Sequence, residues 1–104
     1  MRETEGEAPQ SVYRIVLACD GVPPEAAQQA ARDITKEFFD RPWHRNAVCE
    51  WDGHSLLLRA ENDFDPDGLA LMDEFSDAIS AYIAVGFDGD IRLKSAEVLR
   101  PHKG

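Results

Sequence analysis

The sequence has 104 residues, of which 43% are hydrophobic and 30% are charged, and its formal net charge is −9. This length and hydrophobic content predict one domain around a single core and exclude a disordered chain. The acidic charge argues against direct nucleic-acid binding, which depends on positive charge, and favours either a basic partner or a role in solubility alone. No apolar run is long enough to cross a bilayer and no secretory signal opens the chain, so we expect a cytoplasmic protein.

Residues 1–10 are polar and acidic and predict a tail, as do residues 102–104, which leaves a single domain over residues 11–101. The domain opens with alternating apolar residues that predict a strand over residues 11–19. A helix is expected from the prolines near residue 24 to about residue 39, because proline suits the first turn of a helix. Its predicted apolar stripe consists of Ala27, Ala30, Ala31, Ile34 and Phe38.

Two further strands are predicted over residues 46–51 and 54–61, on either side of Asp52-Gly53. This dipeptide is a strong signal for a two-residue hairpin turn. Such a turn fixes the register of the two strands and places Trp51 opposite His54.

A second helix is predicted over residues 66–85, with Asp65 as its cap and Pro66 in its first turn. Large apolar residues at spacings of three and four give it one apolar stripe. The stripe consists of Leu69, Met72, Phe75, Ile79, Tyr82 and Ile83. The last strand is expected over residues 91–99.

This order of strand, helix, two strands, helix and strand predicts a ferredoxin-like α+β two-layer sandwich. Its antiparallel sheet has strand order 4-1-3-2, and both helices lie on one face. Cys19 and Cys49 then lie on strands separated by a third, too far apart for a disulfide, so we expect reduced thiols.

The acidic residues are concentrated in one part of the chain. Residues 61–90 hold nine of the twenty, and the remaining eleven equal the number of Lys and Arg residues. Residues 60–91 contain no Lys or Arg. On a helical wheel the acids of the second helix fall opposite its apolar stripe. The predicted partner-binding residues are Asp63, Asp65, Asp67, Asp73, Glu74 and Asp77.

Residues 63–74 also resemble the calcium-binding loop of the EF-hand family. The resemblance implies calcium ligands at Asp63, Asp65, Asp67 and Glu74. It covers twelve residues only, and a strand precedes it where the family has a helix. A helix that begins at Pro66 places Glu74 about 13 Å along the axis from Asp65, so the helix and the calcium loop are alternatives.

The face of the sheet away from the helices is expected to combine basic and apolar side chains. A second copy of the chain or another partner would cover such a face. Its predicted interface residues are Val12, Arg14, Val16, Val48, Leu57, Arg59, Arg92 and Lys94.

No nucleophile motif, phosphate-binding glycine loop or nucleotide-binding motif occurs in the sequence, so no cofactor is expected and catalysis is disfavoured. The sequence favours a non-catalytic interaction protein of inhibitor, antitoxin or immunity type. Its second helix would dock on a basic, for example nucleic-acid-binding, protein. The alternatives are a homodimeric small-molecule sensor or enzyme that uses the open sheet face, or a calcium-binding protein.

Overall fold

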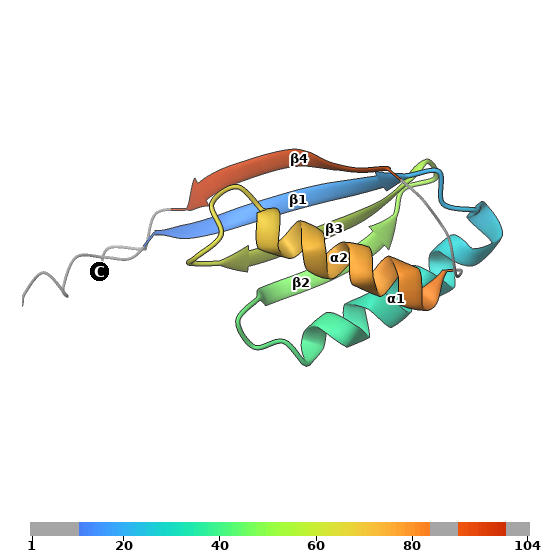
Figure 1. The fold of residues 1–104 in the computed structure, drawn as a ribbon, viewed down its shortest axis with the longest axis horizontal. Helices are drawn as coiled ribbons and strands as arrows, with labels where there is room; N and C mark the ends of the chain where they lie inside the picture. The colour runs from blue at the N-terminus through green and yellow to red at the C-terminus, as the bar shows by residue number, and fades with distance from the viewer. Residues whose placement is uncertain (1–10, 84–89, 100–104) are drawn as a thin grey trace, which may run out of the picture.

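The protein is an α+β structure, seen in a computed structural model that describes residues 11–83 and 90–99 (Figure 1). One antiparallel sheet has the strand order β2-β3-β1-β4, which is the predicted order counted from the other edge. The predicted tails and residues 84–89 lie outside the described residues. In chain order the elements are β1 (Val12–Asp20), α1 (Pro24–Phe39), β2 (Arg45–Trp51), β3 (Ser55–Asn62), α2 (Leu69–Tyr82) and β4 (Asp90–Leu99).

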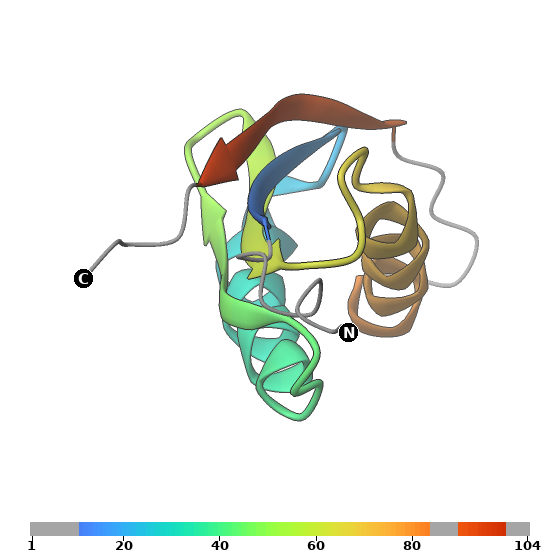
Figure 2. The same cartoon turned by 90° about the vertical axis from the view of Figure 1, so that its left-hand side faces the viewer.

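The core lies between one face of the sheet and the two helices. In β1, the alternating residues Ile15, Leu17 and Cys19 are fully buried, as the sequence predicts. They join the buried residues of α1, α2 and the central strand β3 in one hydrophobic cluster. Figure 2 shows β4 at one edge of the sheet and β2 with α1 toward the other. Within the described residues, no helix is long and apolar enough to span a membrane.

Helix α1 has the predicted bounds and the predicted buried side. Pro24 is its first residue, where the absent N–H costs nothing. Small residues occupy much of the buried stripe and allow the helix to approach the sheet closely. That stripe consists of Ala27, Ala30, Ala31, Ile34 and Phe38.

The β2–β3 hairpin turns one residue later than predicted. The backbone N–H of Asp52 donates to the Ser55 carbonyl at 3.1 Å, so Gly53 and His54 form the turn. The Asp52 side chain also accepts the Ser55 N–H at 2.7 Å, which fixes this position. Trp51 therefore pairs with Leu56 and not with His54. The register error is two residues, so each side chain keeps its predicted face.

Helix α2 begins at Leu69, three residues later than predicted. Pro66 and Asp67 belong instead to a turn that the Gly68 N–H closes by donating to the Asp65 carbonyl at 3.1 Å. The backbone φ of Gly68 is 73°, in the left-handed region that favours glycine. A non-helical residue at position 68 thus delays the helix.

The buried side of α2 also differs from the predicted one. Leu69, predicted to be in the apolar stripe, is 66% exposed. The observed stripe is turned toward two residues that the sequence pattern did not select, Leu71 and Ala78. The buried residues of α2 are Leu71, Phe75, Ala78 and Ile79. Residues 84 and 85, also predicted for this helix, lie outside the described residues.

Strand β4 contains a bulge that sequence periodicity did not predict. Val16 pairs with Ser95 and Leu17 pairs with Leu93, so Lys94 is an additional residue between them. The helix-side face therefore contains odd-numbered residues before the bulge and even-numbered residues after it. The helix-side face of β4 consists of Ile91, Leu93, Ala96 and Val98, and the open face includes Arg92, Ser95, Glu97 and Leu99.

The two cysteines are free and buried, as predicted. Cys19 lies on β1 and Cys49 on β2, with β3 between these strands. Burial is the largest cause that raises the pKa of both thiols, to about 11 for Cys19 and about 12 for Cys49.

Replacing Gly68 with Ala should destabilise the fold by about 1–3 kcal/mol, because alanine is strained at this φ and its Cβ would lie 2.8 Å from Ile15 Cγ2. Gly21→Ala is the matched control, since its φ is 84° and no atom lies within 4 Å of the added Cβ. Urea denaturation measures both changes. Equal losses in the two variants would contradict the predicted contact at Gly68.

The stability should fall above pH 9, because the unfolded chain releases thiol protons that the folded chain retains. The raised pKa of Cys49 stabilises the fold fully below its ordinary pKa of 9.0, and this contribution is lost as the pH rises toward about 12. Between pH 8 and pH 10, Cys49→Ala should lose roughly 1.4 kcal/mol less unfolding free energy than the wild type. Identical pH slopes in chemical denaturation would refute this assignment.

Candidate functional site

The candidate partner-binding carboxylates occupy the β3–α2 connection and helix α2. The structure divides them into two groups. Asp65 and Glu74 are directed inward and hold α2 in place. Asp63, Asp67, Asp73 and Asp77 are exposed.

Asp65 is buried and lies three residues before Gly68, the residue that precedes α2. Its two carboxylate oxygens accept the backbone N–H groups of Ala70 and Leu71 at 3.1 and 3.0 Å. These N–H groups belong to the first turn, where backbone donors have no carbonyl acceptor within the helix. The N-cap residue is therefore Gly68 and not Asp65 as predicted, but the Asp65 carboxylate still accepts hydrogen bonds from the first turn of the helix.

Glu74 binds the connection between α1 and β2. Its carboxylate accepts from Arg41 Nη1 at 2.9 Å, from Trp43 Nε1 at 3.3 Å and from His44 Nε2 at 3.2 Å. Only a fifth of the Glu74 side chain is exposed. The three donors come from 30 to 33 residues away in the sequence, so no local spacing predicts them.

His44 extends this network into the interior. Its side chain is fully buried, and its Nδ1 lies 3.3 Å from the Nδ2 of Asn62, which is also fully buried. The Asn62 Oδ1 accepts the backbone N–H groups of Phe64 and Asp65 at 3.1 and 2.9 Å. This orients the Asn62 amide so that its Nδ2 donates to His44 Nδ1, and His44 Nε2 donates to Glu74.

Arg41 connects the network to α1. Its Nη2 donates to Glu37 at 2.8 Å, and Glu37 also accepts from the Tyr82 hydroxyl at 2.9 Å. Partial burial opposes the Arg41 charge, but the hydrogen bonds that it donates to Glu37 and Glu74 prevail and raise its pKa. The same bond from Arg41, followed by that from Tyr82, lowers the pKa of Glu37. We call the set Glu37, Arg41, Trp43, His44, Asn62 and Glu74 the inter-helix network.

These contacts correct two predictions about the acidic segment. Asp65 and Glu74 were expected on an outward docking face, but their oxygens accept hydrogen bonds from within the chain. The calcium candidates Asp63, Asp65, Asp67 and Glu74 are likewise not assembled as one ligand set. Across residues 11–83 and 90–99, no group of three or more His, Cys, Asp or Glu side chains is placed to hold a metal.

The outward group is electrostatically different. No ion pair within the described residues reaches Asp63, Asp67, Asp73 or Asp77. Asp73 and Asp77 are one helical turn apart on α2, a spacing at which like charges repel. The outer side of α2 and the turn before it therefore present negative charge that no basic side chain of residues 11–83 or 90–99 pairs with, and we call these four residues the outer carboxylates.

A shallow groove between α1 and α2 adds to this charge. It has a volume of about 210 Å³ and is lined by Asp33, Lys36, Glu37, Asp40 and Tyr82. Glu37 is already paired with Arg41, so the carboxylates of Asp33 and Asp40 and the ammonium group of Lys36 set the charge there. Such a groove offers a place for a cationic side chain of a partner.

The open face of the sheet is less basic than the sequence suggested. Arg14 pairs with Glu61 at 3.2 Å and approaches Glu97 at 3.8 Å, and Arg92 pairs with Asp20 at 2.9 Å. Glu97 reaches this face because of the β4 bulge, which the sequence did not reveal. Charges on the open face are therefore largely balanced.

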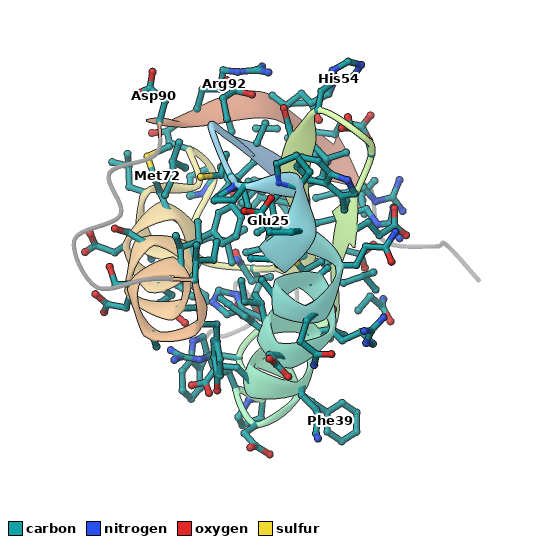
Figure 3. All side chains as sticks on the ribbon, turned by 90° about the vertical axis from the view of Figure 1, so that its right-hand side faces the viewer. Glu25, Phe39, His54, Met72, Asp90 and Arg92 are labelled. Atoms are coloured by element: carbon teal, nitrogen blue, oxygen red, sulfur yellow. The ribbon has the colours of Figure 1, made fainter. Side chains whose placement is uncertain are left out.

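The other predicted interface residues of this face differ in exposure. Val12, Val16, Val48 and Leu57 are half-buried, and Arg59 is exposed between Val16 and Val48. Lys94 lies at the bulge. In Figure 3, Asp90 and Arg92 point away from the helices, as expected for the open face.

A second groove runs between α1 and the edge strand β2. Part of it, about 300 Å³, is lined by Arg32, Thr35, Lys36, Phe39 and Cys49. Phe39 is 86% exposed and projects from the end of α1 into solvent (Figure 3). Thr35 accepts the Cys49 N–H at 2.8 Å, which holds α1 against β2.

Comparison with family models, with curated proteins and with solved structures finds no match to this chain.

Glu74→Gln should destabilise the protein by about 1–3 kcal/mol, because it removes the charge that faces Arg41 inside a partly buried network. Asp73→Asn on the same helix is the matched control and should change stability by less than about 0.5 kcal/mol, since Asp73 is exposed. Thermal and urea unfolding measure both. A Glu74→Gln variant as stable as the control would show that the network does not hold α2.

Proposed function

We propose that this protein is a non-catalytic interaction module that binds a basic protein through the outer carboxylates. The observation that carries the proposal is the division of the acidic segment. Carboxylates that are needed for folding are bonded inside the chain, whereas Asp63, Asp67, Asp73 and Asp77 have no cationic partner within its described part. Exposed charge of one sign accelerates association with a partner of the other sign and selects among partners.

The groove between the helices extends the proposed surface onto α1. Asp33 and Asp40 lie on this side of α1, and Tyr82 stands at its border with α2. A lysine or arginine of the partner would enter the groove while neighbouring basic residues face the outer carboxylates. The partner that fits is a protein with a cluster of basic residues, such as a nucleic-acid-binding protein.

The proposed biological role is that of an inhibitor, antitoxin or immunity-type factor. Carboxylates on a rigid helix can occupy the positions of phosphates and cover a nucleic-acid-binding surface. In the same proposal the βαββαβ domain is a ferredoxin-like sandwich and acts in the cytoplasm. The alternative of a sensor or enzyme that uses the open sheet face is weaker, because Glu61 and Glu97 offset the charge of Arg14 there.

Reversing two outer carboxylates in the variant Asp73→Lys/Asp77→Lys should abolish partner capture and leave the fold intact. The measurement is affinity capture from native lysate with quantitative mass spectrometry at 0.05 and 0.3 M NaCl. Proteins that the wild type captures at low salt should be at least tenfold less abundant in the material that the variant captures. Their capture by the wild type should also weaken at high salt, because screening reduces electrostatic attraction.

The matched control is Glu25→Lys/Glu50→Lys, which changes the net charge equally at two exposed positions outside the proposed surface. This control should capture the same proteins as the wild type. Equal capture by the wild type and Asp73→Lys/Asp77→Lys would overturn the proposal. An equal loss of captured protein with both variants would also overturn it, because it would show a general effect of net charge without a specific surface.

A further inference from the structure

Strand β4 is an edge strand with one unused side. All of its ten residues except the bulge residue Lys94 pair with β1, and no other described strand lies beyond it in the sheet. An edge strand of this length presents a row of N–H and C=O groups that can pair with another strand.

The helices leave the helix-side face of β4 largely uncovered. Leu93 is 44% exposed and Val98 is 61% exposed, although the β1 residue opposite Leu93, Leu17, is fully buried. The apolar character of β4 thus continues past the edge of the core. A second strand alongside β4 would cover these side chains.

We propose that this second strand is β4 of another copy of the chain, paired antiparallel about a twofold axis between Lys94 and Ser95. In this register, Leu93 of each copy faces Ala96 of the other, and Ile91 faces Val98. These four residues all lie on the helix-side face. The two sheets would become one continuous eight-stranded sheet.

The charges on the open face favour the same register. Arg92 of each copy faces Glu97 of the other, which gives two symmetric ion pairs. Both side chains are more than half exposed, at 55% and 57%, so they remain accessible beside their partners within the chain. Antiparallel pairs of opposite charge stabilise neighbouring strands, and like charges there destabilise them.

The β4 bulge is what makes this self-pairing consistent. Arg92 and Glu97 are five residues apart, so a regular strand would place them on opposite faces. The additional residue at Lys94 brings both to the open face, and it brings Leu93 and Ala96 together on the helix side. The bulge lies at the proposed axis, where the two copies of Lys94 and Ser95 meet. This symmetry of faces and charges identifies a second copy as the occupant in preference to an unrelated strand.

Sedimentation velocity at 0.15 M NaCl tests the proposal, since this salt screens the repulsion between two acidic chains. With rising concentration, the wild-type mass should increase from 11.6 kDa toward twice that value. Arg92→Glu and Glu97→Arg should each weaken dimerisation at least tenfold. The double variant Arg92→Glu/Glu97→Arg should restore it, because the exchanged charges again face each other.

Rescue distinguishes contacts between copies from contacts within one chain. Inside the chain, the double variant places a negative charge at position 92 beside Asp20 and a positive charge at position 97 beside Arg14, so an intrachain effect predicts further loss. A wild type that stays monomeric, or a dimer that survives both single reversals, overturns the proposal. Loss without rescue in a folded double variant also overturns it.

Disulfide trapping gives a second measurement that does not depend on the charge variants. Ser95→Cys lies next to the proposed axis, so mild oxidation should link two copies through their new thiols. Ser80→Cys, exposed on α2, is the control and should link at least tenfold more slowly. The native cysteines are buried and do not compete. Equal linking at both positions contradicts the β4 interface.

Discussion

The hydrogen bonds of Glu74 with Arg41, Trp43 and His44 fix how α2 is rotated on the domain. A helix with apolar residues on much of its surface can be turned through several orientations at little cost in burial. Glu74 removes this freedom, because its charge needs the donors of the α1–β2 connection. On the helix held in this way, Asp73 and Asp77 are exposed. The surface charge of the protein thus follows from a partly buried contact.

Asp65 acts in the same way at the start of α2. Its carboxylate binds the free N–H groups of the first helical turn, and Asn62 holds the loop that carries it. Two acids of this segment, Asp65 and Glu74, therefore serve the fold, and the four outer carboxylates are exposed. The two proposals concern separate surfaces: the outer carboxylates for a basic protein and the β4 edge for a second copy. Neither surface requires the other.

Periodicity in the sequence was sufficient to predict the α+β class and all buried positions of α1, because these depend on local patterns of two or 3.6 residues. The strand order followed from the order of the elements and from the rules that govern their connections. The hairpin turn was misplaced because the Asp52 side chain, and not a backbone carbonyl, accepts the Ser55 N–H. The start of α2 was misplaced because Gly68 adopts a left-handed conformation, which composition alone does not reveal.

The charged site was harder to predict for a different reason. The helical wheel placed Glu74 outward because it contains no information about Arg41 or His44, which lie 33 and 30 residues away in the sequence. The bulge at Lys94 was also invisible, since a strand with one additional residue has no distinct local pattern. The faces of the polar and apolar residues between Arg92 and Glu97 can be assigned only from their pairing with β1.

The division of carboxylates into an inward and an outward group is tested most directly by solvent paramagnetic relaxation in the wild-type protein. A neutral, soluble paramagnetic probe relaxes the side-chain protons of each assigned Asp and Glu according to its exposure. We expect strong relaxation at Asp73 and Asp77 and at least severalfold weaker relaxation at Glu74 and Asp65. Relaxation of Glu74 as strong as that of Asp73 would contradict an inward Glu74.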